Sequence, residues 1–306
     1  MYVFRCVVVE FRKLIKSGQT SFTISLPIDW VKRHKLRKQD IVAVQEEGDL
    51  LIIKPHASKA EEQNSQVIEA ETLPPGTLGL ELFKAYISGA TVIWLHAKGI
   101  ERLQEKLRNI MPLFPGLELE EFADKKIAYR NYFDVQSVTY AHLLQKQKLI
   151  VTTLLREIES LLSNPLQMNL LTLANFIDGT YRQNTLIVAK AMRMTSITKS
   201  EMSYVLMSNQ LLDIARAVKE FLTSAKYLGS DVVQGLLSQF SMLRQNIEAF
   251  IVGEKYDHFL LIQSQTEHCK ALARQSEDGN EALVYGALSN IGSAAEQYAK
   301  IAIIYR

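Results

Sequence analysis

Apolar side chains alternate with polar ones along residues 20–26, where Phe22, Ile24 and Leu26 occupy every second position. This period of two predicts a strand with one apolar and one polar face. Pro27 follows and ends the strand, because proline cannot donate a backbone hydrogen bond, but it is tolerated in the first turn of a helix. The pattern therefore predicts a strand that leads directly into a helix.

Short elements continue on both sides of this strand. Gly18 can supply the positive φ of a tight turn before it. Residues 29–34 are long enough for one or two helical turns, and the apolar runs 41–44 and 50–53 flank a Gly-Asp pair as the arms of a β-hairpin. A unit of about 50 residues buries too little surface to be stable alone. We therefore expect residues 1–55 to need a partner.

A linker and a second small unit follow. Residues 56–76 are polar and end in two prolines and a glycine, which predicts an irregular linker. Residues 77–137 have the pattern of a small α/β module of helix, strand, helix and strand. Its expected elements are a helix over 78–88, a strand over 91–95, a helix over 100–113 and a strand over 117–122.

The chain from residue 138 to residue 306 has the apolar spacing of helices. The predicted helices are 138–163, 168–193, 199–228, 231–253, 256–276 and 280–304. A weak repeat at an offset of 77 residues relates the third helix to the sixth. It matches Leu211, Ile214, Ala217, Val218 and Phe221 with Leu288, Ile291, Ala294, Ala295 and Tyr298. The offset predicts two similar three-helix halves.

Composition places the chain among ordinary globular proteins, with a net charge of +2. The distribution of charge is more informative, because residues 1–55 contain ten Lys and Arg against six Asp and Glu, and the remainder is slightly acidic. Cys6 and Cys269 lie far apart, which is typical of reduced thiols and predicts a cytoplasmic protein. Residues 1–13 are interrupted by charges, so we expect a first strand there rather than a signal peptide, and we expect no membrane insertion.

The N-terminal stretch resembles the SpoVT/AbrB swapped-hairpin DNA-binding domain, in the variant found at the front of archaeal PhoU-like regulators. The matching positions are Gly18, Thr20, Phe22, Ile24, Ser25, Leu26, Pro27, Trp30 and Val31. The chain departs from the pattern at Lys38-Gln39-Asp40, where the family usually has Lys-Gly-Asp. The resemblance implies that two copies interleave their hairpins into one β-barrel, which makes the protein a homodimer or a higher oligomer.

The rest of the chain is similar to the same regulators. Residues 85–89 (Ala-Tyr-Ile-Ser-Gly) and 116–118 (Gly-Leu-Glu) fit segments of their α/β insert, and residues 138–306 resemble the PhoU fold, a pair of three-helix bundles. The expected fold class is therefore multidomain α+β: an AbrB-like barrel, a small α/β module and an all-α domain.

Many PhoU proteins bind a metal through a Glu-Arg-Ile-Gly/Ala-Asp pattern on these helices. Here the acidic positions align with Leu212, Arg216, Ser289 and Ser293, none of which is a carboxylate. We therefore expect no metal and no cofactor, although Glu201, Asp213, Glu220 and Glu296 are acids that could form a site elsewhere on the helices. A further acidic motif of the family keeps its first acid, Asp178, and loses its last.

Signatures of catalysis are missing from the sequence. It contains no phosphate-binding glycine loop, no dinucleotide fingerprint, no zinc-protease motif and no nucleophile elbow, and its six histidines are scattered. We therefore expect a protein that is not an enzyme.

Double-stranded DNA is the expected partner of residues 1–55. The residues expected to contact it are Arg12, Lys13, Lys16, Gln19, Thr20, Lys32 and Arg33, with Lys35, Arg37 and Lys38 as further cations. The combined resemblance implies a transcriptional regulator of phosphate uptake with a helical interaction domain. The alternative is an adaptor that does not bind DNA and regulates a phosphate transporter ATPase or a sensor kinase through its helices. An antitoxin-type regulator would leave the helical half unexplained.

Overall fold

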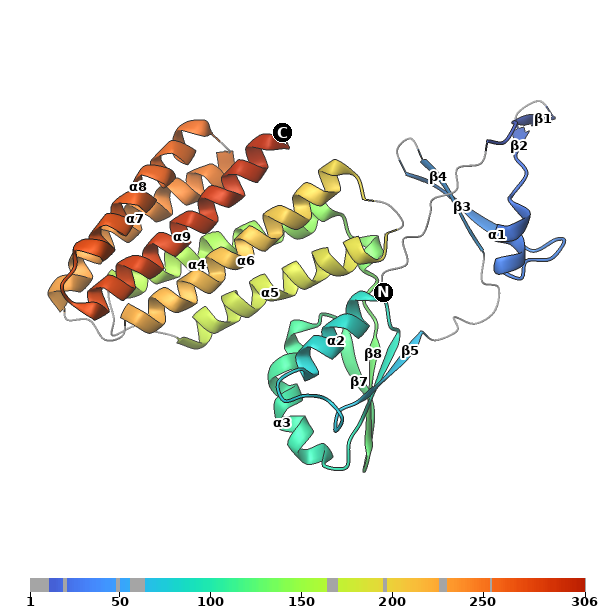
Figure 1. Ribbon diagram of the computed structural model, residues 1–306, viewed down its shortest axis with the longest axis horizontal. Coiled ribbons are helices and arrows are strands. Elements are labelled where there is room, and N and C mark those ends of the chain that lie inside the picture. The colour runs from blue at the N-terminus through green and yellow to red at the C-terminus, as the bar shows by residue number, and fades with distance from the viewer. Residues whose placement is uncertain are drawn as a thin grey trace. The chain divides into compact units, whose positions relative to one another are not determined.

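The computed structural model in Figure 1 describes residues 11–18, 21–47, 50–55, 64–163, 170–194, 197–225, 230–253 and 255–305. The fold is mixed α+β, with small sheets toward the N-terminus and a helical C-terminal region. The chain divides into two compact units, residues 1–62 and 63–306.

The N-terminal unit contains two short antiparallel hairpins and one short helix. The first hairpin pairs β1 (Ile15–Ser17) with β2 (Ser21–Thr23), and the second pairs β3 (Val42–Glu47) with β4 (Leu50–Pro55). Helix α1 (Ile28–Arg33) lies between them in the chain. The second hairpin, the short helix and the turn at Gly18, whose φ is +79°, were all predicted.

One expectation for this unit needs correction. Of the strand predicted over residues 20–26, the described part is β2 (Ser21–Thr23). Residues 24–27 pair with no described strand, so the strand ends well before Pro27. The barrel was expected of two interleaved copies, and in the described part of this one chain the two hairpins are separate two-stranded sheets. The strand expected over residues 1–13 falls largely outside the described residues, and residues 11–13 form no regular element.

The described residues of the N-terminal unit form no buried core. None of the side chains that the structure describes between residues 11 and 53 is buried. Its exposed apolar side chains are Phe11, Leu14, Ile15, Phe22, Ile24, Ile28, Ile41, Val44 and Leu51. Phe22, on the apolar face of the predicted strand, remains 66% exposed.

The α/β module begins earlier and has more strands than predicted. Its elements are β5 (Ser65–Glu69), α2 (Leu78–Ile87), β6 (Val92–His96), α3 (Ile100–Ile110), η1 (Met111–Leu113), β7 (Leu117–Ala123) and β8 (Lys126–Asn131). The sheet order is β5-β6-β8-β7, with β5 parallel to β6 and the other pairs antiparallel. Residues 65–69 therefore belong to the sheet and not to the linker predicted over 56–76. The prediction failed because Ser65–Glu69 is mostly polar and is held by pairing with β6, which is remote in sequence.

Helices α2 and α3 lie on the same side of this sheet (Figure 1). The core between the helices and the sheet contains alternate residues of the strands. Ile93 and Leu95 of β6 and Ile127 of β8 are fully buried in it, together with Leu82 of α2. This alternation is the period of two that a sheet with one buried face requires.

The helical region agrees with the six predicted helices. They are α4 (Tyr140–Ser163), α5 (Leu170–Met192), α6 (Lys199–Ala225), α7 (Ser230–Gly253), α8 (Tyr256–Gln275) and α9 (Gly279–Ile304). Within the first three helices each packs on the other two, and the same holds for the last three. The two halves meet along α6 and α9 and along α4 and α7, and a single hydrophobic core runs through both (Figure 1).

The α/β module is fixed to the helices through α5. The Arg193 guanidinium, just beyond α5, donates a 2.6 Å hydrogen bond to the Tyr86 carbonyl at the end of α2 and lies 5.7 Å from the Tyr86 ring centroid. The Lys190 ammonium donates to the Gln136 carbonyl at 3.1 Å, and Ala189 is buried in the core of the module. Burial lowers the pKa of Arg193, as desolvation of a cation does.

Among the helices that the structure describes, none combines the length and the apolar character needed to cross a bilayer.

Candidate nucleic-acid interface

The predicted DNA-contacting cations of the N-terminal unit are exposed. Lys16 lies in β1 opposite Phe22, and Arg12 and Lys13 precede that strand. The β1–β2 hairpin therefore carries cations beside exposed apolar side chains. Gln19 and Thr20, the two polar residues expected at the turn, lie outside the described residues.

A second group of cations lies at the end of α1. Lys32 and Arg33 occupy the last turn of this six-residue helix, where positive charge is favoured by the helix dipole. These cations could act on one phosphate together with the free backbone N–H groups of the helix only if both lay at the same end. They lie at opposite ends of α1, since free N–H groups occur only in the first turn. The cations alone are therefore the chemistry that α1 offers.

The chain leaves α1 through a Schellman motif centred on a lysine. The Leu36 N–H donates to the Val31 carbonyl and the Lys35 N–H to the Lys32 carbonyl, each at 3.1 Å. Lys35 has φ of +52°, the left-handed conformation that glycine usually supplies at this position. A side chain there costs about 1 kcal/mol or more. The structure thus keeps a cation where glycine would be more stable.

A tight turn follows at Lys38-Gln39-Asp40, where the pattern that the sequence resembles usually has Lys-Gly-Asp. The Asp40 N–H donates to the Arg37 carbonyl at 3.1 Å, and the Arg37 N–H donates to the Asp40 carboxylate at 2.7 Å. Gln39, at the third position, has φ of +78°, as a type II turn requires. The geometry expected of Lys-Gly-Asp is therefore kept without the glycine, and Arg37 and Lys38 are held beside Lys35.

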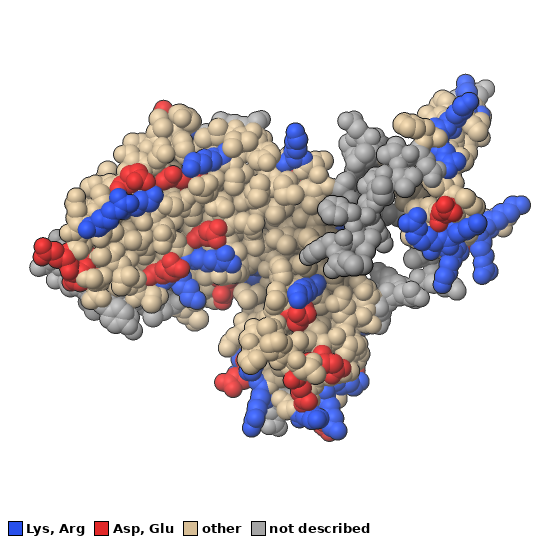
Figure 2. Space-filling model, viewed as in Figure 1, with Lys and Arg blue, Asp and Glu red and all other residues tan. Residues whose placement is uncertain are grey.

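Basic side chains predominate on the N-terminal unit in the view of Figure 2. Between residues 11 and 44 there are eight Lys and Arg and two Asp and Glu, and all ten are exposed. Lys32, Arg33, Lys35, Arg37 and Lys38 come from one short stretch whose path is fixed by α1 and the two turns. Sequence reasoning found these cations, but it had no signal for the left-handed backbone that orients them.

The family's metal positions hold other contacts. Leu212 and Ser289 are buried, and Arg216 donates hydrogen bonds to the Tyr181 hydroxyl and the Asp213 carboxylate, each at 3.0 Å. Glu296 is buried with one carboxylate oxygen 3.9 Å from the Lys300 ammonium. Across the described residues, no three His, Cys, Asp or Glu side chains converge as a metal site would require.

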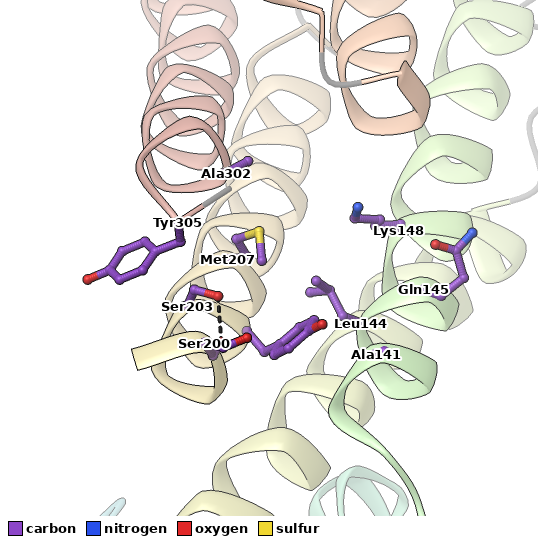
Figure 3. A pocket seen from close by; sticks show the side chains of 10 residues that line it. Ala141, Leu144, Gln145, Lys148, Ser200, Ser203, Met207, Ala302 and Tyr305 are labelled. Carbon is purple, nitrogen blue, oxygen red and sulfur yellow. Dashed lines mark hydrogen bonds between the residues drawn. The ribbon is translucent and has the colours of Figure 1, made fainter. Parts of the chain in front are cut away.

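A cavity of about 280 Å³ opens between α4, α6 and α9 (Figure 3). Lys148 is the one charged residue in its lining, beside small and apolar side chains such as Ala141, Leu144 and Met207. Ser203 already donates its hydroxyl to the Ser200 carbonyl. This lining offers one cation and few free polar groups, so it is a weaker candidate than the basic surface.

Comparisons with protein-family models, with curated proteins and with solved structures each give no match to this chain.

Proposed function

We propose that this protein is a cytoplasmic transcriptional regulator that binds double-stranded DNA as a homodimer through residues 1–55. The observation that carries the proposal comes from the N-terminal unit. Its described residues combine a dense group of exposed cations with exposed apolar side chains, and none of the described side chains between residues 11 and 53 is buried. The resemblance to archaeal PhoU-like regulators supplies the regulated process, which is phosphate uptake.

The exposed apolar residues support the dimer. Complete burial of one large apolar side chain contributes about 1.5–3 kcal/mol. Phe22, Ile28, Ile41 and Leu51 are each more than half exposed in the single chain. A second copy that interleaves its hairpins with the first would cover these side chains on both chains, and the two pairs of hairpins would then form the barrel of the SpoVT/AbrB family.

The charge distribution supports DNA as the partner. A dimer doubles the described excess of cations, and lysine and arginine contacts to phosphate provide most of the affinity of proteins for duplexes. The left-handed conformation of Lys35 is a second argument, because backbone strain of this kind is found most often at functional sites. Residues 64–305 would then act as the regulatory part.

A salt titration tests DNA binding. Replacing Lys13 and Lys16 by alanine should weaken binding to duplex DNA and flatten the plot of log K against log salt, by about 0.9 for each phosphate that the protein no longer neutralises. Both residues are exposed, so the fold should be kept. The matched control replaces Lys199 and Lys219, two exposed lysines of α6, and should leave affinity and slope unchanged.

A second variant, which replaces Lys32 and Arg33 by alanine, tests the end of α1 in the same way. Together the two double variants distinguish a DNA-binding regulator from an adaptor that does not bind DNA. If both double variants bind with the affinity and slope of the parent protein, the N-terminal unit is not a DNA-binding surface. The adaptor that acts on a transporter ATPase or a kinase would then be the better proposal. Light scattering of the full chain at micromolar concentration tests the dimer separately, and a monomer would contradict it.

A further inference from the structure

A second basic site lies where the α/β module meets the helices. A cavity of about 310 Å³ is lined on the module side by Pro115 and Phe133, and on the helix side by His142 and Lys146 of α4 and by Arg182 and Gln183 of α5. These residues are far apart in sequence and all lie in the unit 63–306. The volume is within the range of small-molecule sites.

The lining of this cavity is basic. It includes a lysine, an arginine and a histidine, and no aspartate or glutamate. Within the described chain, neither Lys146 nor Arg182 forms an ion pair, although Asp178 lies one turn before Arg182 on α5. Cations that line one cavity repel one another, and this repulsion falls when an anion lies between them.

Several other basic groups of the same unit are neutralised by neighbouring acids. Arg156 and Arg244 pair with Glu248, both at distances below 3 Å. A further hollow at the edge of the sheet contains His96, which lies 2.9 Å from Glu69, and Lys126, which lies 2.6 Å from Glu121. The cavity between Phe133 and Arg182 is different, because its cations have no such counter-charge.

A buried amide in the same lining has an unused polar atom. Gln183 is only 6% exposed, and its side-chain carbonyl oxygen has no hydrogen-bond partner among the described residues. A buried polar atom without a partner is destabilising, so native proteins rarely keep one without a ligand, a water or a functional reason. The oxygen and nitrogen of a glutamine amide exchange places by one rotation, so Gln183 can accept from a hydroxyl or donate to an oxyanion.

The apolar wall of the cavity is rigidly built. Gly116 has φ of +78°, and a Cβ at this position would lie 2.3 Å from the Phe133 Cβ, so only glycine allows the two segments to approach. The Tyr132 N–H donates to the Gly116 carbonyl at 2.8 Å, and the Tyr86 hydroxyl donates to the Pro115 carbonyl at 2.8 Å. The backbone that carries Phe133 is therefore fixed, and Phe133 lines the same cavity as Lys146 and Arg182.

We propose that this cavity binds a small organic oxyanion, with a phosphate or carboxylate group on Lys146 and Arg182 and an apolar part on Phe133. Gln183 hydrogen-bonds the polar group at the base of the site. The ligand contacts the module and the helices together, so binding strengthens their association. This inference does not depend on the DNA proposal, because all its residues lie outside the N-terminal unit.

Calorimetric titration of the full chain with three probes tests the chemistry. Phenyl phosphate carries both features, inorganic phosphate carries the anion alone, and phenol carries the ring alone. Phenyl phosphate should bind most tightly, inorganic phosphate more weakly, and phenol should show no measurable binding. Absence of binding by phenyl phosphate, or equal binding of phenol, would overturn the proposal.

Variants locate the site. Arg182→Gln and Lys146→Gln should each weaken phenyl phosphate binding by about tenfold, the effect of losing a charge-assisted hydrogen bond. Gln183→Leu keeps the volume and should weaken binding while the melting temperature holds or rises, because the unpartnered carbonyl oxygen is removed. Lys219→Gln, on the exposed face of α6, is the control for general charge. If the control weakens binding as much as Arg182→Gln and Lys146→Gln do, or if these two leave it unchanged, the cavity is not the site.

Discussion

Arg193 offers a direct measurement of how firmly the α/β module is held to the helices. Its guanidinium donates a 2.6 Å hydrogen bond to the Tyr86 carbonyl and lies 5.7 Å from the Tyr86 ring. Replacing it by methionine keeps an unbranched apolar chain and removes both contacts. The Tyr86 carbonyl would still accept a hydrogen bond from the Gly89 N–H, so it would not be left unpaired.

The expected loss of unfolding free energy in Arg193→Met is the balance of opposing contributions. Loss of the charge-assisted hydrogen bond costs about 1.5–3 kcal/mol, and loss of the cation–π contact costs about 0.5–1 kcal/mol. In the other direction, the buried Arg193 Nε has no partner within the described chain, and removing it restores about 1 kcal/mol. We therefore expect the Arg193→Met variant to lose about 1–3 kcal/mol of unfolding free energy.

The two tryptophans make the assay possible. Trp94 lies in β6 of the module and Trp30 in α1, so the variant Trp30→Phe leaves Trp94 fluorescence as a probe of the module. Urea unfolding followed by this fluorescence should shift to lower denaturant in Arg193→Met. Far-ultraviolet circular dichroism follows the helices in the same samples, and a smaller shift there would mean that the module detaches first.

A surface arginine provides the comparison. Arg156 of α4 pairs with Glu248 at 2.7 Å, but its side chain is 63% exposed, and exposed pairs contribute about 0–1 kcal/mol. Arg156→Met should therefore shift the transition less than Arg193→Met. If Arg193→Met unfolds at the same urea concentration as the parent protein, or shifts no more than Arg156→Met, the buried contact does not hold the module.

Three further predictions concern local structure. Gln39→Gly should stabilise the N-terminal unit by up to about 1 kcal/mol, because glycine adopts the φ of +78° at this position without strain. Thermal unfolding of the full chain is the test, and an unchanged or lower melting temperature would contradict the prediction. Burial raises the pKa of the Cys269 thiol to about 11, so in a Cys6→Ser variant iodoacetamide at pH 8 should label it only after unfolding, and rapid labelling of the folded protein would contradict its burial. Burial also raises the pKa of Tyr86 to about 12, above its unfolded value of 10. The contribution of Tyr86 to the unfolding free energy is therefore full below pH 10 and is lost as the pH rises toward 12. In urea unfolding, Tyr86→Phe should lose less unfolding free energy over this pH range than the parent protein does.

The sequence predicted elements well where the signal is local. All six long helices were predicted, with boundaries that differ from the structure by at most three residues, because each combines apolar periodicity with glycine or proline at an end. Strands β5 and β8 were not predicted. Only Ile68 is buried in β5, and the sequence Ser-Gln-Val-Ile-Glu shows no alternation of polar and apolar residues. The strand forms because it pairs with β6, which is remote in sequence. The Ile127-Ala128-Tyr129 run of β8 was a signal that could have been used.

The candidate sites also differ in how far the sequence could predict them. Exposed cations such as Lys16 and Arg33 can be identified from sequence, because lysine and arginine are rarely buried. The left-handed φ of Lys35 could not be predicted, since no residue preference favours it there. The cavity beside Phe133 and Arg182 was also beyond sequence reasoning, because only tertiary packing brings these two residues together.

The contact between α6 and α9 gives the helical region an internal symmetry. The repeat that relates Leu211 and Phe221 to Leu288 and Tyr298 lies on the two helices that join the halves, and all four side chains are buried. Contact between equivalent surfaces is what a twofold homodimer has. The helical region therefore has the form of a twofold dimer of three-helix units contained within one chain. Because both copies of the surface belong to one chain, the two sides of the contact need not be identical, and Phe221 in one half corresponds to Tyr298 in the other.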